Sequence, residues 1–245
     1  IGTATATDII QVASLTNDAP TSFLLGDTVV TWTATDQDGN SASSTQTISV
    51  IDTTAPILTV PENIIVDATD LDNLVTVGQA TSTDLIDDSP VITNDAPAIF
   101  PLGETIVTWT SADVFGNSVD STQVIEVQAC GKPISYYNTI MGTPEDDVLT
   151  GTTQADLIFA LGGDDIVNGD KGNDCIFGGE GDDILFGNEG NDNLVGDEGN
   201  DIIKGQSGND ILADGTGLDV IDGGDDQDTC TIENSSDDLA IKCEL

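Results

Sequence analysis

Aspartate recurs at every ninth position through the C-terminal part of the sequence, and this regular supply of carboxylates is the feature best suited to chemistry. Ten consecutive nonapeptides fill residues 142–231 without an insertion, and each has aspartate at its sixth position. The ten residues are Asp147, Asp156, Asp165, Asp174, Asp183, Asp192, Asp201, Asp210, Asp219 and Asp228. The eighth position is apolar in the first nine units and is Cys230 in the last. Carboxylates in register with an apolar residue predict turns that present oxygen ligands, which Ca²⁺ prefers.

Glycine at the fourth position supports this interpretation, because a tight turn needs backbone conformations with positive φ that glycine adopts readily. Seven consecutive units have it: Gly163, Gly172, Gly181, Gly190, Gly199, Gly208 and Gly217. Such turns aim several carbonyl oxygens at a point that a short aspartate side chain also reaches. These glycines and the ten aspartates are therefore the predicted metal ligands, and Ca²⁺ is the predicted cofactor, with about five to eight ions.

The ten units resemble the glycine- and aspartate-rich nonapeptide (RTX) repeat family, whose pattern is Gly-Gly-x-Gly-x-Asp-x-apolar-x. Gly178–Phe186 (GGEGDDILF) and Gly187–Val195 (GNEGNDNLV) are two of the five units that have glycine at both the first and fourth positions. The resemblance implies a parallel β-roll in which two units make one coil of 18 residues and each ion lies between turns two units apart. Each short strand then points its apolar eighth residue into the core.

This geometry divides the aspartates into two columns, one for odd units and one for even units, with up to eight sites between column neighbours. Some units depart from the pattern: Glu145, Gln154 and Asp226 replace the fourth-position glycine, and Ala160 and Asp214 replace the first. We therefore expect five principal sites and three further ones. The five are bracketed by Asp165/Asp183, Asp183/Asp201, Asp201/Asp219, Asp174/Asp192 and Asp192/Asp210.

The N-terminal half contains a second, longer repeat. Residues 2–50 match residues 78–127 with a gap of one residue, so that Trp32 corresponds to Trp109. Apolar and polar residues alternate in both copies, which predicts antiparallel strands of a β-sandwich with the tryptophans in the core. The copies resemble the hyalin-repeat (HYR) domain, an immunoglobulin-like module of extracellular proteins, at motifs such as Asp52–Pro56 (DTTAP) and Asp113–Asn117 (DVFGN).

The first copy has no counterpart of residues 52–76, so we expect an incomplete sandwich. Two interpretations are open: the sequence is cut from a longer chain, or a neighbouring subunit donates the missing strand. The alternating tail Asp238–Leu245 is either such a donor or the closing strand of its own domain.

The predicted fold is all-β, with immunoglobulin-like sandwich repeats followed by a parallel β-roll. The predicted domains are a partial sandwich (1–51), a complete sandwich (52–129), a connector and N-terminal cap (130–141), the roll (142–231) and a C-terminal cap or tail (232–245).

The four cysteines lack the paired spacing of a zinc site, and the chain has no histidine, so disulfides are the better interpretation. The roll should present an outward apolar patch of Leu157, Phe159, Cys175 and Phe177, and residues 131–141 are the nearest cover. This favours a Cys130–Cys175 bridge, and proximity in sequence favours Cys230–Cys243, although three connectivities are possible. Disulfides indicate an oxidising compartment.

Composition excludes several classes of partner. The chain has 45 acidic residues against four lysines, with no arginine, and its formal net charge is -41. A field of this sign repels nucleic acids and anionic membrane surfaces, and no apolar run is long enough for a membrane span. No catalytic triad or zinc motif is present, so we expect no enzymatic activity.

Two local motifs are less informative. Asp36–Asn40 resembles a calcium loop but is better interpreted as a hairpin turn. Asn234–Ser236 is the only glycosylation sequon.

The sequence therefore predicts a secreted, calcium-binding structural or adhesive protein that is extracellular or attached to the cell surface. Its expected partners are calcium, copies of itself arranged head to tail, and a cell-surface protein or glycan. Two alternatives remain: a self-assembling extracellular filament subunit that uses strand donation, and the non-catalytic C-terminal part of a larger secreted enzyme.

Overall fold

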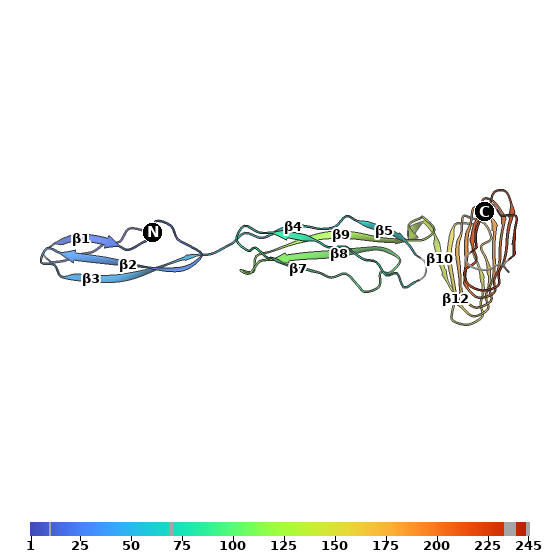
Figure 1. Ribbon diagram of the computed structural model, residues 1–245, viewed down its shortest axis with the longest axis horizontal. Helices are drawn as coiled ribbons and strands as arrows, with labels where there is room; N and C mark the ends of the chain where they lie inside the picture. Colours follow the sequence, from blue (N-terminus) through green and yellow to red (C-terminus); the bar gives the residue numbers. More distant parts are fainter. Residues whose placement is uncertain (10, 69–70, 233–238, 244–245) are drawn as a thin grey trace. The chain divides into compact units, whose positions relative to one another are not determined.

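The computed structural model describes residues 1–9, 11–68, 71–232 and 239–243, and its regular structure is almost entirely β (Figure 1). The chain divides into two compact units. One contains residues 1–60, 80–94 and 109–121, and the other contains residues 61–79, 95–108 and 122–245. Within the described ranges, no helix is long and apolar enough to cross a membrane. The sequon at Asn234 lies outside the described residues.

The first copy forms a single antiparallel sheet of three strands. They are β1 (Val12–Asn17), β2 (Gly26–Asp36) and β3 (Ser41–Val50), in the order β1-β2-β3. Val30 on β2 is fully buried, and Trp32 is only half-buried. The structure places no second sheet among the described residues before Ile51, and the partial sandwich stays a prediction. The turn at Asp36–Asn40 joins β2 to β3, as predicted.

The second copy contains six strands in two sheets: β4 (Ile57–Thr59), β5 (Ile64–Asp67), β6 (Thr81–Thr83), β7 (Val91–Asn94), β8 (Gly103–Ala112) and β9 (Ser118–Gln128). One sheet has the order β4-β6 and the other β5-β9-β8-β7. Trp109 is 4% exposed, as expected for a core residue. The immunoglobulin-like sandwich itself stays a prediction. Within the matched residues β7 pairs with β8 in the expected antiparallel direction, whereas β5, which precedes them, runs parallel to β9. No hairpin joins these two strands, so nothing forces them to run in opposite directions.

The C-terminal part is a parallel β-solenoid of two six-stranded sheets. The first sheet contains β10 (Asn138–Met141), β12 (Asp156–Gly162), β14 (Cys175–Glu180), β16 (Asn193–Glu198), β18 (Ile211–Ala213) and β20 (Thr229–Thr231). The second contains β11 (Val148–Thr150), β13 (Ile166–Asn168), β15 (Ile184–Glu189), β17 (Ile202–Ser207), β19 (Val220–Asp225) and β21 (Leu239–Ile241).

Strands pair with a register of 18 residues, as the two-unit coil predicts. Ile158 lies opposite Ile176, for example, and Leu185 lies opposite Ile203. The eighth-position residues stack between the two sheets and form the core of the roll. The tail strand β21 pairs in parallel with β19, so in the described residues the tail closes its own roll.

The predicted outward patch is present and covered. Leu157, Phe159, Cys175 and Phe177 are at most 6% exposed, and Ala129 is buried with them. Residues of the connector pack on this cluster, which confirms the predicted cover, but Leu102 of the second copy does so too. The connector contributes Ile134 and Tyr137, which belong to or follow the 3-10 helix η1 (Ile134–Tyr136).

Both predicted disulfides are confirmed. Cys130 is bonded to Cys175, which ties the connector to β14 under this apolar cluster. Cys230 is bonded to Cys243, which ties β20 to the end of the tail. No cysteine among the described residues is therefore free.

Candidate metal centre

In the last eight nonapeptides the turns between the strands have positive φ at two positions. The seven fourth-position glycines have φ values from 99° to 148°, as predicted. The second position is also left-handed in most units, even where it is not glycine: Leu161, Asp170, Asn188, Asp197 and Gln206 have φ values from 70° to 86°. Aspartate and asparagine tolerate this conformation better than most residues.

First-position glycines are needed for a reason other than positive φ. Gly187 and its equivalents do not have positive φ, but they lie against the carboxylate of their own unit. A Cβ atom on Gly187 would overlap Asp192 Oδ2 and would lie 2.9 Å from the carbonyl oxygen of Gly205. Glycine therefore leaves a space that two oxygens border. The carbonyl of Gly205 is a candidate ligand that the sequence analysis missed.

The sixth-position aspartates form the two predicted columns, linked by hydrogen bonds. The backbone N–H of each aspartate donates to Oδ1 of the aspartate two units later, with N···O distances from 2.6 to 2.9 Å. The odd column is Asp147, Asp165, Asp183, Asp201 and Asp219, and the even column is Asp156, Asp174, Asp192, Asp210 and Asp228. Each link coincides with one of the eight bracketed sites.

The second oxygen of these carboxylates is the informative one. In seven of them, Oδ2 is buried and has no hydrogen-bond partner: Asp165, Asp174, Asp183, Asp192, Asp201, Asp210 and Asp228. These side chains are only 1–2% exposed. Burying a carboxylate without a partner is costly, so the arrangement calls for a cation. A hard, oxygen-seeking ion fits an environment made of carboxylate and carbonyl oxygens.

Burial also changes the protonation of these groups. Desolvation and, to a smaller extent, the neighbouring carboxylates of the same column raise the pKa of Asp174, Asp183 and Asp192 to about 7. For Asp201 and Asp210 the same causes raise the pKa to about 6. A bound cation would favour the ionised form and oppose this shift.

The first two units hold their carboxylates differently. Asp147 Oδ2 accepts hydrogen bonds from the backbone N–H of Thr143 at 2.6 Å and from its hydroxyl at 2.9 Å. Thr152 makes the equivalent bonds to Asp156 Oδ2, at 2.6 and 3.0 Å. In these two units, protein donors thus bond to Oδ2, the oxygen that has no partner in the middle of the roll. These are also units whose fourth residue is not glycine, in keeping with their expected weaker sites.

A second ladder of side chains was missed by the sequence analysis. Fifth-position residues accept a hydrogen bond at Oδ1 from the backbone N–H two units later, as in Asp182 to Asn200 at 2.8 Å. The acceptors are Asp146, Asp164, Asp182, Asn200, Asn173, Asn191 and Asn209. Aspartate or asparagine at the fifth position of seven units is the signal that could have revealed this ladder.

Comparison with known proteins agrees with these observations. Residues 141–175, 176–203 and 204–237 match the RTX calcium-binding nonapeptide repeat (four copies). Hyalin of Strongylocentrotus purpuratus is 38% identical over 133 residues, which cover 50% of this chain and 11% of that protein. Hyalin of Lytechinus variegatus is 33% identical over 154 residues, covering 58% of this chain and 29% of that protein. The chain therefore spans less than a third of either relative.

Proposed function

We propose that this chain, whose C-terminal roll consists of RTX calcium-binding repeats, is a calcium-dependent extracellular structural or adhesive protein. In this proposal calcium ions fold and stiffen the roll. The observation that supports it most strongly is the row of seven buried carboxylate oxygens, Oδ2 of Asp165, Asp174, Asp183, Asp192, Asp201, Asp210 and Asp228, that have no protein partner. A calcium ion between two coils would give each such oxygen the partner that it lacks.

Each ion is proposed to lie between column neighbours, as between Asp174 and Asp192 or between Asp192 and Asp210. Carbonyls of first- and fourth-position glycines supply further oxygens toward the six to eight that calcium takes. Five to eight ions are proposed, with the five central sites binding most strongly. If free calcium is ten times each dissociation constant, each ion stabilises the roll by about 1.4 kcal/mol. Eight ions then contribute about 11 kcal/mol, comparable to the whole stability of a typical domain.

Charge explains why the roll would need calcium rather than only tolerate it. Residues 142–231 contain 23 acidic residues and two lysines. The apolar core is thin, because each nonapeptide contributes one inward side chain, such as Leu185 or Leu194. Mutual repulsion of the carboxylates therefore opposes folding with little hydrophobic burial to offset it.

The extracellular placement is supported by two observations. Two disulfides join all four cysteines, and disulfides persist in oxidising compartments. Calcium is abundant outside the cell, so a roll that needs calcium to fold also fits an extracellular location. The similarity to hyalin over half of the chain supports a structural or adhesive role. The absence of histidine from the sequence argues against triad and histidine-zinc catalysis.

Limited proteolysis with trypsin tests the proposal directly, because the roll contains only two cleavable residues, Lys171 and Lys204. In calcium we expect both sites to resist cleavage, and in chelator we expect both to be cut rapidly. Cleavage that proceeds equally in calcium and in chelator would refute calcium-dependent folding. A second sample with magnesium in place of calcium should behave like the chelator sample, since magnesium demands shorter, octahedral coordination.

Sedimentation of the full chain separates the proposal from the filament alternative. We expect calcium to make the particle more compact without a change in mass. Growth to large assemblies on addition of calcium would favour the filament subunit instead.

A further inference from the structure

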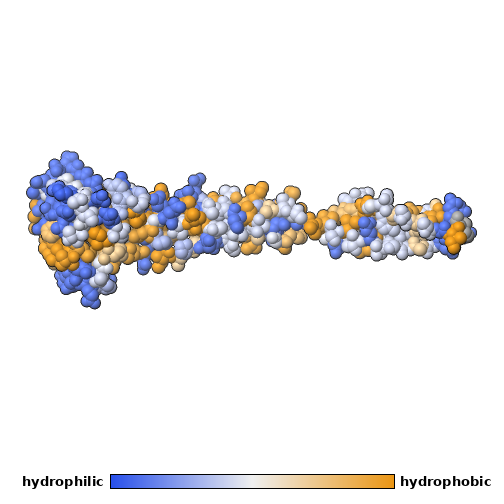
Figure 2. Space-filling view, turned by 180° about the vertical axis from the view of Figure 1, so that it is seen from behind, coloured by the Kyte–Doolittle hydropathy of each residue, from blue (hydrophilic) through white to orange (hydrophobic). Residues whose placement is uncertain are grey.

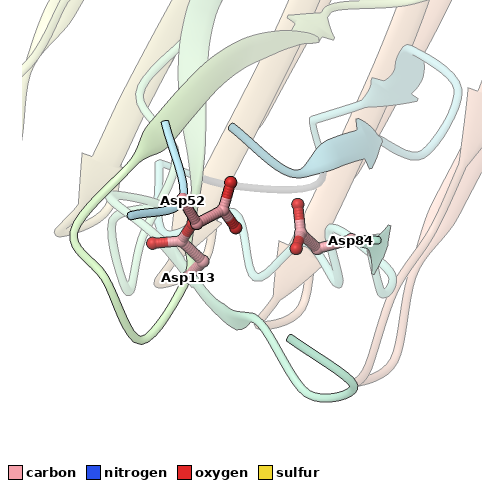
Figure 3. Close-up of side chains that lie close together, drawn as sticks. All are labelled: Asp52, Asp84 and Asp113. Atoms are coloured by element: carbon pink, nitrogen blue, oxygen red, sulfur yellow. The ribbon is translucent and has the colours of Figure 1, made fainter. Parts of the chain in front are cut away.

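Three aspartates outside the roll converge at one end of the second copy. Asp52 lies between β3 and β4, Asp84 directly follows β6, and Asp113 directly follows β8. One carboxylate oxygen from each lies within 4.8 Å of the others. Figure 3 shows the Asp84 carboxylate facing those of Asp52 and Asp113. Two oxygens on opposite sides of a calcium ion lie about 4.6 to 5.2 Å apart, so this spacing allows one ion to contact all three.

The carboxylates are held in place by the backbone of their own loops. Asp84 Oδ1 accepts hydrogen bonds from the N–H groups of Ile86 and Asp87 at 2.8 and 2.9 Å. Asp113 is 7% exposed and accepts bonds at both oxygens from Asn117, at 2.8 and 2.7 Å. The Asn117 side chain also donates to the backbone carbonyl of Asp52. The arrangement is therefore fixed before any ion binds.

An unpaired, buried oxygen distinguishes this cluster from an ordinary group of surface acids. Asp52 Oδ1 accepts two bonds from Thr54, but Asp52 Oδ2 is buried and has no hydrogen-bond partner. No protein cation is available to it, because residues 1–131 contain no lysine, arginine or histidine. Three close carboxylates with a buried, unpaired oxygen repel one another strongly unless a cation binds.

We propose that Asp52, Asp84 and Asp113 form a calcium site that is separate from the roll. Carboxylate and backbone carbonyl oxygens at this spacing suit a hard divalent cation, and calcium accepts the irregular geometry of loop ligands better than magnesium does. The ion ties the segment after β3 to two loops of the second copy. Calcium therefore restrains the link between the two N-terminal copies as well as folding the roll.

The first copy supplies a matched control. Asp8 and Asp36 correspond in sequence to Asp84 and Asp113. Asp36 makes the same bonds to Asn40, at 2.9 and 2.8 Å, that Asp113 makes to Asn117. No third carboxylate joins this pair among the described residues. Asp36→Asn thus removes the same charge from the same kind of turn without touching the proposed site.

Native mass spectrometry of the full chain counts the bound ions. At a free calcium concentration that saturates the wild type, we expect Asp84→Asn and Asp52→Asn each to retain one ion fewer, through at least tenfold weaker binding. Asp36→Asn should retain the full number. Wild-type ion counts in both Asp52 and Asp84 variants, or an equal loss in Asp36→Asn, would overturn the proposal.

Hydrogen exchange in the same proteins guards against a variant that simply misfolds. In the wild type, calcium should slow exchange at residues 52–56 and 113–117, and this effect should vanish in Asp84→Asn while that in the roll persists. Calcium protection of the roll without any effect at these residues would refute the new site and leave the proposed function intact. Calcium protection of residues 52–56 and 113–117 without any effect on the roll would refute the proposed function and leave the new site intact.

Discussion

In the middle of the roll, the two oxygens of a sixth-position aspartate have separate roles. Oδ1 accepts a backbone hydrogen bond that holds two coils in register, as Asp192 does for the N–H of Asp174 at 2.8 Å. Oδ2 lies buried beside backbone carbonyls and is the proposed calcium ligand. Asparagine keeps an oxygen acceptor for the ladder but replaces the second oxygen with an amide, so this substitution separates the two roles.

Asp192→Asn should weaken calcium binding selectively, because Asp192 borders two proposed sites. Loss of both ions should lower the stability of the roll in calcium by about 3 kcal/mol if each site is tenfold saturated. Thermal unfolding of wild type and variant in the same calcium concentration, followed by circular dichroism, measures this difference. Glu198→Gln removes the same charge from an exposed residue at the end of β16 and should have little effect. Equal destabilisation by both variants would contradict a ligand role for Asp192.

Gly187→Ala tests the space beside that carboxylate. The added methyl group would overlap Asp192 Oδ2, so we expect weaker calcium binding and a loss of at least about 1 kcal/mol of stability. Gly162→Ala is the matched control, since its nearest neighbour would lie at 3.7 Å and its φ is not positive. Calcium titration of both variants by calorimetry decides the matter, and wild-type affinity in Gly187→Ala would show that the space is not part of the site.

Turns and strands form one repeating element, in which coil stacking brings like charges together. Because burial raises the pKa of Asp174, Asp183 and Asp192 to about 7 without a cation, the folded roll binds more protons than the unfolded chain between about pH 4 and 7. This contribution to stability is complete below about pH 4 and is lost as pH rises through 7.

The metal-free roll should therefore become more stable on acidification. In metal-depleted buffer we expect the strand signal of the roll, absent at pH 8, to increase as pH falls to 5, while calcium affinity falls because protons compete for the same oxygens. Circular dichroism spectra across this pH range test the first expectation, and calcium titrations test the second. A strand signal in metal-depleted buffer that is larger at pH 8 than at pH 5 would contradict the burial of unpaired carboxylates.

Sequence periodicity predicted the element well and its finer chemistry less well. The invariant sixth position and the apolar eighth position specify the coil length, the columns and the core, because a strict period leaves one register. The fifth-position ladder was missed because aspartate and asparagine alternate there without a fixed type. The role of first-position glycine depends on the distance to a carboxylate in three dimensions, which spacing alone does not give.

At the scale of the whole molecule, acidic residues outnumber basic ones in every part of the sequence, but they are arranged differently. Figure 2 shows hydrophilic surface at both edges of the roll with hydrophobic surface between them. In the roll the carboxylates follow a period, and the sequence reveals them. Asp52, Asp84 and Asp113 lie far apart in the sequence and meet only because loops of the second copy bring them together. Such a cluster has no periodic signal.

A calcium titration of the full chain, followed by far-ultraviolet circular dichroism, tests the central claim most directly. Starting in chelator, we predict that the strand signal of the roll is absent, appears cooperatively as calcium is added, and does not appear with magnesium. The N-terminal copies should contribute a constant strand signal throughout. A complete strand signal already present in chelator would contradict the claim that calcium folds the roll.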